Sequence, residues 1–254
     1  PQVIVTNPPG THTDRLEGTT YTYGDSEVTI HVGDSKEGWV DSYVRLLEIC
    51  SDPAMEGLSY IHLDLGNVRP NGSPIKGFGG TANPVALPLL YEQVMNVLGK
   101  AKGRKVTAYE ACLLLNWAAV TTVAGNIRRS ARWDGYSYGS PSMTGAKDNL
   151  WSQNDEGQWV IDPEKDALRM VNISAITHTK PTLEECISFV RKQYETGEGA
   201  LYYAPAALVR TNADLLSTNA DRWAFEYAYT SLGKSIGKAY PVSYTHLRAH
   251  ETLM

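Results

Sequence analysis

Residues 58–66, LSYIHLDLG, and the segment 67–84 that follows them, NVRPNGSPIKGFGGTANP, decide the fold expected for this chain. The first stretch is short, largely apolar and closed by a glycine, which is typical of a strand buried inside a domain. The second is rich in glycine, proline, asparagine and serine, residues that adopt the special backbone angles of turns. The sequence therefore predicts a buried strand that opens into a long, structured loop.

Further elements are expected on both sides of this strand. Residues 27–33, EVTIHVG, alternate in the manner of a strand, whereas 38–52 place apolar residues at helical spacing. A helix is expected over 85–100, with Pro88 near its first turn, where the missing N–H costs little. The order of elements is thus strand, helix, strand, loop, helix.

Two capping boxes mark the starts of later helices. Thr107 and Glu110 open a helix that runs almost wholly apolar to Gly125, so this helix should contact the core on several sides. Thr182 and Glu185 open a second one.

Between these helices the chain is polar and aromatic, and 151–159, WSQNDEGQW, predicts a β-hairpin. The alternation of helices with short buried strands predicts an α/β domain with the strands inside, and an open sheet and a closed barrel both agree with it.

The composition is that of an ordinary globular protein. Of 254 residues, 42% are hydrophobic and 20% charged, and the net charge of -5 gives no basic footprint for nucleic acid or an anionic membrane. No membrane span or signal peptide is evident, so a cytoplasmic location is expected.

Cys50, Cys112 and Cys186 are far apart, and each lies in an apolar helical pattern. They are expected to be buried small hydrophobes rather than disulfide partners or zinc ligands.

The loop after residue 66 has the features of a phosphate-binding segment. It combines glycines with two cations, Arg69 and Lys76, and two hydroxyls, Ser73 and Thr81, ahead of a helix N-terminus. It contains neither a P-loop nor a dinucleotide-binding fingerprint. A purely structural loop of tight turns is the alternative interpretation.

A second candidate is 124–132, AGNIRRSAR, where three arginines follow the glycine that ends an apolar helix. Arginine forks match phosphate oxygens and also stack on bases. A positively charged helix C-terminus is the alternative. Two loops that both suit a nucleotide make each interpretation stronger.

Several segments together resemble one family, the monomeric adenosylcobalamin-dependent (class II) ribonucleotide reductases of cyanobacterial and phage type. The segments are DSKEGWV, IHLDLGNVRPNGSPIKGFGGTA, VTAYEACLLLNWAAVTTVAGNIRRSA and AKDNLWSQNDEGQWVIDPEKDALRMVN, and the resemblance covers most of residues 1–216. The resemblance implies a ten-stranded α/β barrel, of which residues 1–241 would be about the first half.

The resemblance also implies roles for both loops. Residues 68–77 fall at the first specificity loop and 124–132 at the second, between a deoxynucleotide effector and the substrate base. Asn83 and Pro84 depart from the family pattern and leave open how the next helix begins. Asn172 and Ser174 fall near a strand that approaches the substrate pocket. The residues expected to face effector or substrate in the loops are Arg69, Ser73, Lys76, Gly125, Asn126, Arg128 and Arg129.

The activity implied by the resemblance is the reduction of ribonucleoside triphosphates by a thiyl radical that adenosylcobalamin generates. A thioredoxin-type reductant and a monomeric state are implied with it. The three cysteines match none of the catalytic positions of the family, so no catalytic residue is expected here and the chain alone should be inactive. The alternatives are a non-catalytic nucleotide-binding regulatory module and a class I or glycyl-radical relative.

The last stretch, 242–254, reads VSYTHLRAHETLM. His246 and His250 with Glu251 have a spacing that could bind zinc on a helix, but a third ligand is missing. Back-translation of 242–252 resembles a transposase sequencing adapter, so this tail is expected to be foreign to the protein and to bind no metal. The opening at Pro1 agrees with a piece of a longer chain.

Overall fold

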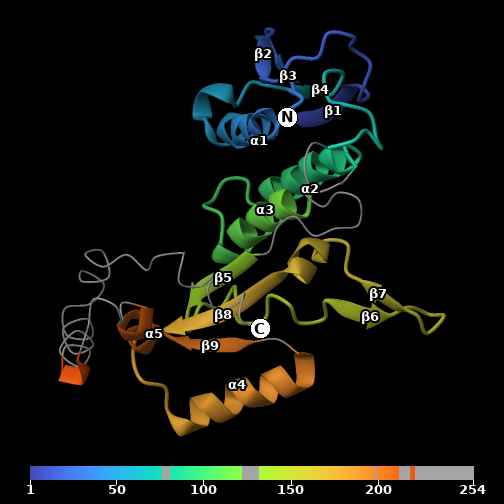
Figure 1. Ribbon diagram of the computed structural model, residues 1–254. Helices are drawn as coiled ribbons and strands as arrows, with labels where there is room; N and C mark the ends of the chain where they lie inside the picture. The colour runs from blue at the N-terminus through green and yellow to red at the C-terminus, as the bar shows by residue number, and fades with distance from the viewer. Residues whose placement is uncertain (76–80, 122–131, 198, 212–217, 221–254) are drawn as a thin grey trace. The chain divides into compact units, whose positions relative to one another are not determined.

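The computed structural model describes residues 1–75, 81–121, 132–197, 199–211 and 218–220 (Figure 1). They form two compact units. The first consists of the described residues within Pro1–Arg132 and Asn149–Val171, and the second of those within Trp133–Asp148 and from Asn172 onward.

The first unit is built on a four-stranded sheet with strand order β1-β4-β3-β2. Its strands are β1 (Gln2–Asn7), β2 (Thr20–Tyr23), β3 (Glu27–His31) and β4 (Tyr60–Asp64). β4 is the strand expected from LSYIHLDLG, and it pairs in parallel with both β1 and β3, whereas β2 is antiparallel to β3. Parallel pairing brings the carboxyl ends of β1, β3 and β4 to one edge of the sheet.

One face of this sheet forms the core of the first unit. Val28 and Ile30 of β3 and Ile61 and Leu63 of β4 are fully buried. The residues that alternate with them, such as His62, point to the opposite, partly exposed face. Helix α1 (Lys36–Ser51), which begins at the N-cap Ser35, lies beside the sheet (Figure 1).

Helices α2 (Ala86–Lys100) and α3 (Ala108–Thr121) pack against each other in the same unit. The predicted capping box of α3 is confirmed, because the Thr107 N–H donates to the Glu110 carboxylate at 2.8 Å and the Glu110 N–H donates to Thr107 Oγ1 at 3.2 Å. Leu113, Trp117 and other side chains on several sides of α3 are buried, as its apolar composition predicts. Two 3-10 helices complete the unit, η1 (Pro53–Met55) and η2 (Asp166–Met170).

The predicted hairpin is confirmed as β6 (Trp151–Gln153) paired with β7 (Trp159–Ile161). The turn is closed by Asn154, whose side-chain oxygen accepts from the N–H groups of Glu156 and Gln158.

The second unit contains a three-stranded sheet of order β5-β8-β9. Its elements are β5 (Arg132–Ser137), β8 (Val171–Thr177), α4 (Leu183–Thr196), β9 (Ala200–Tyr203) and α5 (Ala204–Thr211). Strands β8 and β9 are parallel, and α4 lies alongside β9 (Figure 1). The capping box at Thr182 and Glu185 is present, and α4 ends at Gly197 with φ +72°.

These elements confirm a mixed α/β fold. The described residues form sheets of four, three and two strands, and none of these sheets is a ten-stranded barrel. Within the same residues no helix is both long and apolar enough to cross a membrane.

Candidate functional site

The carboxyl-terminal edge of the first sheet gathers polar side chains around one carboxylate. Asp64 ends β4, and its register partners are Asn7 of β1 and His31 of β3. His12 joins them from the segment after β1, where its ring reaches the same carboxylate. We call Asn7, His12, His31 and Asp64 the Asp64 cluster.

Asp64 is held by donors on all sides. Its carboxylate accepts from His31 Nδ1 at 2.8 Å, from Asn7 Nδ2 at 3.1 Å and from the Gly66 N–H at 2.9 Å. His12 Nε2 lies 3.1 Å from each of the two carboxylate oxygens. Only 5% of the Asp64 side chain is exposed, so these contacts replace the water that an aspartate normally binds.

The pKa of Asp64 follows from this environment. Burial alone would raise the pKa of the carboxyl, but the hydrogen bonds from Gly66, His31, His12 and Asn7 outweigh it and lower the pKa to about 2. Asp64 is therefore an anion throughout the neutral range. A fixed, fully bonded anion suits positioning of its neighbours and does not suit proton transfer at neutral pH.

The Asp64 cluster positions the start of the loop after β4. The His12 N–H donates to the Gly66 carbonyl at 3.0 Å, and the Gly10 N–H donates to the Val68 carbonyl at 2.7 Å. A side chain at Gly66 would meet the His12 ring, because a Cβ placed there lies 2.1 Å from His12 Cδ2. The backbone of 10–12 is thus closed onto 66–68 by close contact as well as by hydrogen bonds.

Arg69, expected to face a nucleotide, is engaged at the base of the same loop. Its Nε and its backbone N–H donate to Asp34 Oδ1 at 2.9 and 3.0 Å. The arginine side chain is 32% exposed and the aspartate 12%. This ion pair joins the loop to the turn before α1, so the described contacts of Arg69 are structural.

Ser73 also has an internal partner, since its hydroxyl donates to the Pro70 carbonyl at 2.7 Å. The loop then doubles back as a narrow hairpin. The Gly72 N–H donates to the Ala82 carbonyl at 3.0 Å, and the Ala82 N–H returns a bond to Ser73 at 2.8 Å. Gly72 has φ +81°, a conformation that favours glycine.

The other predicted loop residues fall outside the described ranges. They are Lys76, Gly125, Asn126, Arg128 and Arg129, together with His246, His250 and Glu251 of the tail. Among the residues that the structure does describe, no group of three or more histidine, cysteine, aspartate and glutamate side chains could hold a metal ion.

Asn172 and Ser174, the predicted substrate-pocket residues, lie on β8 in the second unit. They point to the same face of the sheet, with Asn172 exposed and Ser174 only 4% exposed. Ser174 Oγ accepts a hydrogen bond from the indole Nε1 of Trp133 at 2.9 Å. The serine therefore holds an aromatic side chain that sequence patterns did not single out.

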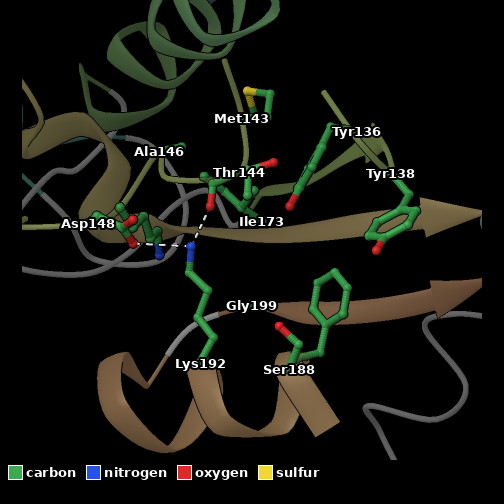
Figure 2. A pocket seen from close by; sticks show the side chains of 12 residues that line it. Tyr136, Tyr138, Met143, Thr144, Ala146, Asp148, Ile173, Ser188, Lys192 and Gly199 are labelled. Carbon is green, nitrogen blue, oxygen red and sulfur yellow. Dashed lines mark hydrogen bonds and ion pairs between the residues drawn. The ribbon is translucent and has the colours of Figure 1, made fainter. Parts of the chain in front are cut away.

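The opposite face of this sheet is covered by α4 and encloses a cavity of about 170 Å³ (Figure 2). Tyr136, Ile173 and Phe189 contribute to its walls. Lys192 closes one side, where its ammonium lies 3.2 Å from Asp148 Oδ1 and also donates to the Thr144 carbonyl. The charge of Lys192 is thus already compensated within the wall.

The three cysteines lie on three different helices, α1, α3 and α4, and no disulfide joins them. Cys112 is buried as expected, while Cys50 and Cys186 are only partly buried. Burial raises the pKa of the Cys50 thiol, which keeps it in the less reactive protonated form.

The Asp64 cluster was missed in the sequence although a signal for it was present. Asp64 and His31 each stand at the end of a predicted strand, and parallel neighbours bring such ends together. His12 and Asn7 had no such signal, because β1 was not predicted.

Residues 11–98 match the family described as "B12-dependent ribonucleotide reductase, insertion domain". This range includes every member of the Asp64 cluster except Asn7. The resemblance expected from the loop motifs is confirmed.

Individual relatives are named as adenosylcobalamin-dependent ribonucleoside-triphosphate reductases. The chain is 37% identical over 109 residues to the adenosylcobalamin-dependent ribonucleoside-triphosphate reductase of Lactobacillus helveticus. This match covers 42% of this chain and 15% of that protein. It is 37% identical over 100 residues to the enzyme of the same name from Lactobacillus leichmannii, covering 39% and 14%. The chain thus matches about one seventh of the length of these relatives.

A crystal structure of a B12-dependent (class II) ribonucleotide reductase is also similar. The likeness covers 61% of this chain and 20% of the other, with 24% identity and a TM-score of 0.47.

Proposed function

We propose that this chain is part of an enzyme that reduces ribonucleoside triphosphates to deoxyribonucleoside triphosphates with adenosylcobalamin, and that its own residues recognise nucleotides. The observation that carries the proposal is the match of residues 11–98, which include the described stem of the loop, to the family described as "B12-dependent ribonucleotide reductase, insertion domain". The 37% identity over 109 residues to a curated reductase agrees with it. The described stem of this loop is fixed by the Asp64 cluster and by the Arg69–Asp34 pair. A pre-organised stem lowers the entropic cost of binding a ligand at these residues.

The finer parts of the proposal follow from the family. Its fold is a ten-stranded α/β barrel, and the parallel pairs β1–β4, β3–β4 and β8–β9 support a parallel sheet of that kind. The partners are a ribonucleoside triphosphate, a deoxynucleotide effector and a thioredoxin-type reductant. The whole enzyme would be a cytoplasmic monomer, with the specificity loops at 68–77 and 124–132.

The cavity beneath α4 does not fit the cobalamin itself. The cavity beneath α4, at about 170 Å³, is smaller than the roughly 300 Å³ at which pockets for drug-sized ligands begin, and a corrin is larger than such ligands. Its walls also offer no histidine. We therefore assign the cofactor to the whole enzyme and derive no step of the reaction from the residues described.

The chain is expected to bind nucleoside triphosphates without reducing them. Equilibrium dialysis with ATP, dATP and dTTP should give saturable binding, with inorganic triphosphate as the control for charge alone. Binding of inorganic triphosphate as tight as that of all three nucleotides would contradict nucleotide recognition, and so would the absence of saturable nucleotide binding.

Turnover is the complementary test. Because Cys50, Cys112 and Cys186 lie on three separate helices and match no catalytic position of the family, we expect no deoxynucleotide from this chain with adenosylcobalamin and a dithiol. Product chromatography after long incubation checks this result. Measurable, cobalamin-dependent product would overturn the assignment of roles.

A further inference from the structure

The face of the second unit's sheet that points away from α4 carries an aromatic surface. Tyr136 and Tyr138 line the cavity beneath α4 (Figure 2), so Trp133 and Gly135, which alternate with Tyr136 along β5, lie on the other face. Ser174 of β8 and Tyr202 of β9 share that face with them. We call Trp133, Gly135, Ser174 and Tyr202 the indole platform.

Two contacts and one glycine fix the orientation of the Trp133 ring. Its Nε1 donates to Ser174 Oγ at 2.9 Å, and its ring centroid lies 5.4 Å from that of Tyr202 at an interplanar angle of 57°. The glycine is Gly135, which leaves room for the indole because it has no side chain. A Cβ there would lie 2.6 Å from Trp133 Cη2 and 2.4 Å from Ile176 Cδ1, so the indole occupies the space that a side chain would take.

The ring so fixed remains 49% exposed. Here hydrogen bonding and ring packing hold the edge of the indole, and much of its surface stays accessible. The ordering cost of the side chain is therefore met before any ligand arrives.

Asn172, which is exposed and stands two residues before Ser174 on β8, lies on the same face of the sheet as Ser174. An amide offers both a donor and an acceptor, as the edge of a nucleobase does. A rigid aromatic ring with an amide beside it is a combination that proteins use to bind bases, with stacking for affinity and edge hydrogen bonds for selection.

We propose that Trp133 stacks on the base of a bound nucleotide and that Asn172 hydrogen-bonds the edge of that base, with Ser174 and Gly135 as positioning residues for the indole. This inference rests on the proposed nucleotide recognition and specifies a residue for it. Tyr202 supports the indole from the side. The ligand class is a purine or pyrimidine nucleoside, with or without phosphates.

The experiment uses the full 254-residue chain with ¹⁵N-labelled tryptophan, whose six indole N–H signals are resolved by NMR. Trp133→Phe identifies the Trp133 signal by its loss. We expect adenosine and cytidine to shift this signal, and ribose 5-phosphate and inorganic triphosphate to leave it in place. Removal of a stacking ring costs about 1–3 kcal/mol per base, so Trp133→Leu should weaken adenosine binding by about 5- to 150-fold.

Matched variants separate stacking from folding. Trp133→Phe keeps an aromatic face and should retain part of the affinity, whereas Gly135→Ala should weaken binding by displacing the indole. Trp159→Leu is the control, because Trp159 is 66% exposed on the separate β6–β7 hairpin and should leave adenosine affinity unchanged. Amide spectra of each variant confirm that the sheet remains folded.

The outcomes are distinct for the two proposals. If nucleoside triphosphates bind the chain but Trp133→Leu binds adenosine as tightly as the natural sequence, the indole platform is overturned and nucleotide recognition stands. A shift of the Trp133 signal by ribose 5-phosphate equal to that by adenosine would overturn the assignment to the base. If neither nucleosides nor triphosphates bind at millimolar concentration, both proposals fail together, whereas adenosine binding that depends on Trp133 supports the platform.

Discussion

Replacing Asp64 with asparagine is expected to destabilise the first unit by about 2–4 kcal/mol, because it removes a buried charge on which four donors converge. The asparagine keeps one acceptor oxygen but turns an NH₂ group toward donors. Native-state hydrogen exchange at the amides of Leu65 and Val32 measures this loss of stability locally. These amides donate to the carbonyls of Asn7 and Asp64, so their hydrogen bonds flank the cluster.

The matched control is Asp14→Asn, which removes the same charge from an exposed position in the same unit. It should change the exchange free energies by less than about 0.5 kcal/mol. Equal effects of the two substitutions would mean that net charge, and not the hydrogen bonds around Asp64, determines the stability of this edge.

Asp64 also sets the acid stability of the first unit. The folded pKa of about 2 lies below the ordinary 3.8 of the unfolded chain. The stabilisation is therefore complete above about pH 4 and is lost as the pH falls through 2, and at 1.36 kcal/mol per pKa unit it amounts to about 2 kcal/mol. The difference in unfolding free energy between Asp64→Asn and the natural sequence should shrink by about that amount between pH 5 and pH 2. A difference that stays constant would contradict the assigned pKa.

The elements that local sequence determines were predictable. The capping boxes at Thr107 and Thr182 and the hairpin 151–159 depend on residues within a few positions of one another, and all three are present. Strand β4 was predictable from its apolar run for the same reason. In each case the decisive contacts are close in sequence, so the pattern contains them.

The elements that depend on distant partners were missed. Strand β5, with Asp134 and Gly135 in its interior, has few residues that favour a strand, and it is held by pairing in the sheet with β8. Likewise, the Asp64 cluster unites residues up to 57 positions apart, which only the parallel register brings together. The partner of Arg69 was missed for the same reason. Its residue type suggested binding to phosphate, whereas the fold pairs it with Asp34, 35 positions away.

Gly66→Ala is expected to cost the first unit about 2–3 kcal/mol, because the added methyl group would overlap the His12 ring and force it off the Asp64 carboxylate. A double-mutant cycle with His12→Ala tests whether the His12 ring causes this cost. In a His12→Ala background the ring is gone, so the same Gly66→Ala change should cost less than about 1 kcal/mol. Hydrogen exchange at the Leu65 amide measures all four corners of the cycle.

Gly99→Ala provides the matched control for the glycine itself. Gly99 lies in α2 with no atom within 4 Å of a Cβ placed there, so the substitution should stabilise the helix by up to about 1 kcal/mol. The same change from glycine to alanine is therefore expected to lower the free energy of unfolding at Gly66 and to raise it at Gly99. If Gly66→Ala cost as much without His12 as with it, the penalty would lie in the backbone of the loop. The closure of 10–12 onto 66–68 would then be a consequence of the loop's path and not the cause of its position.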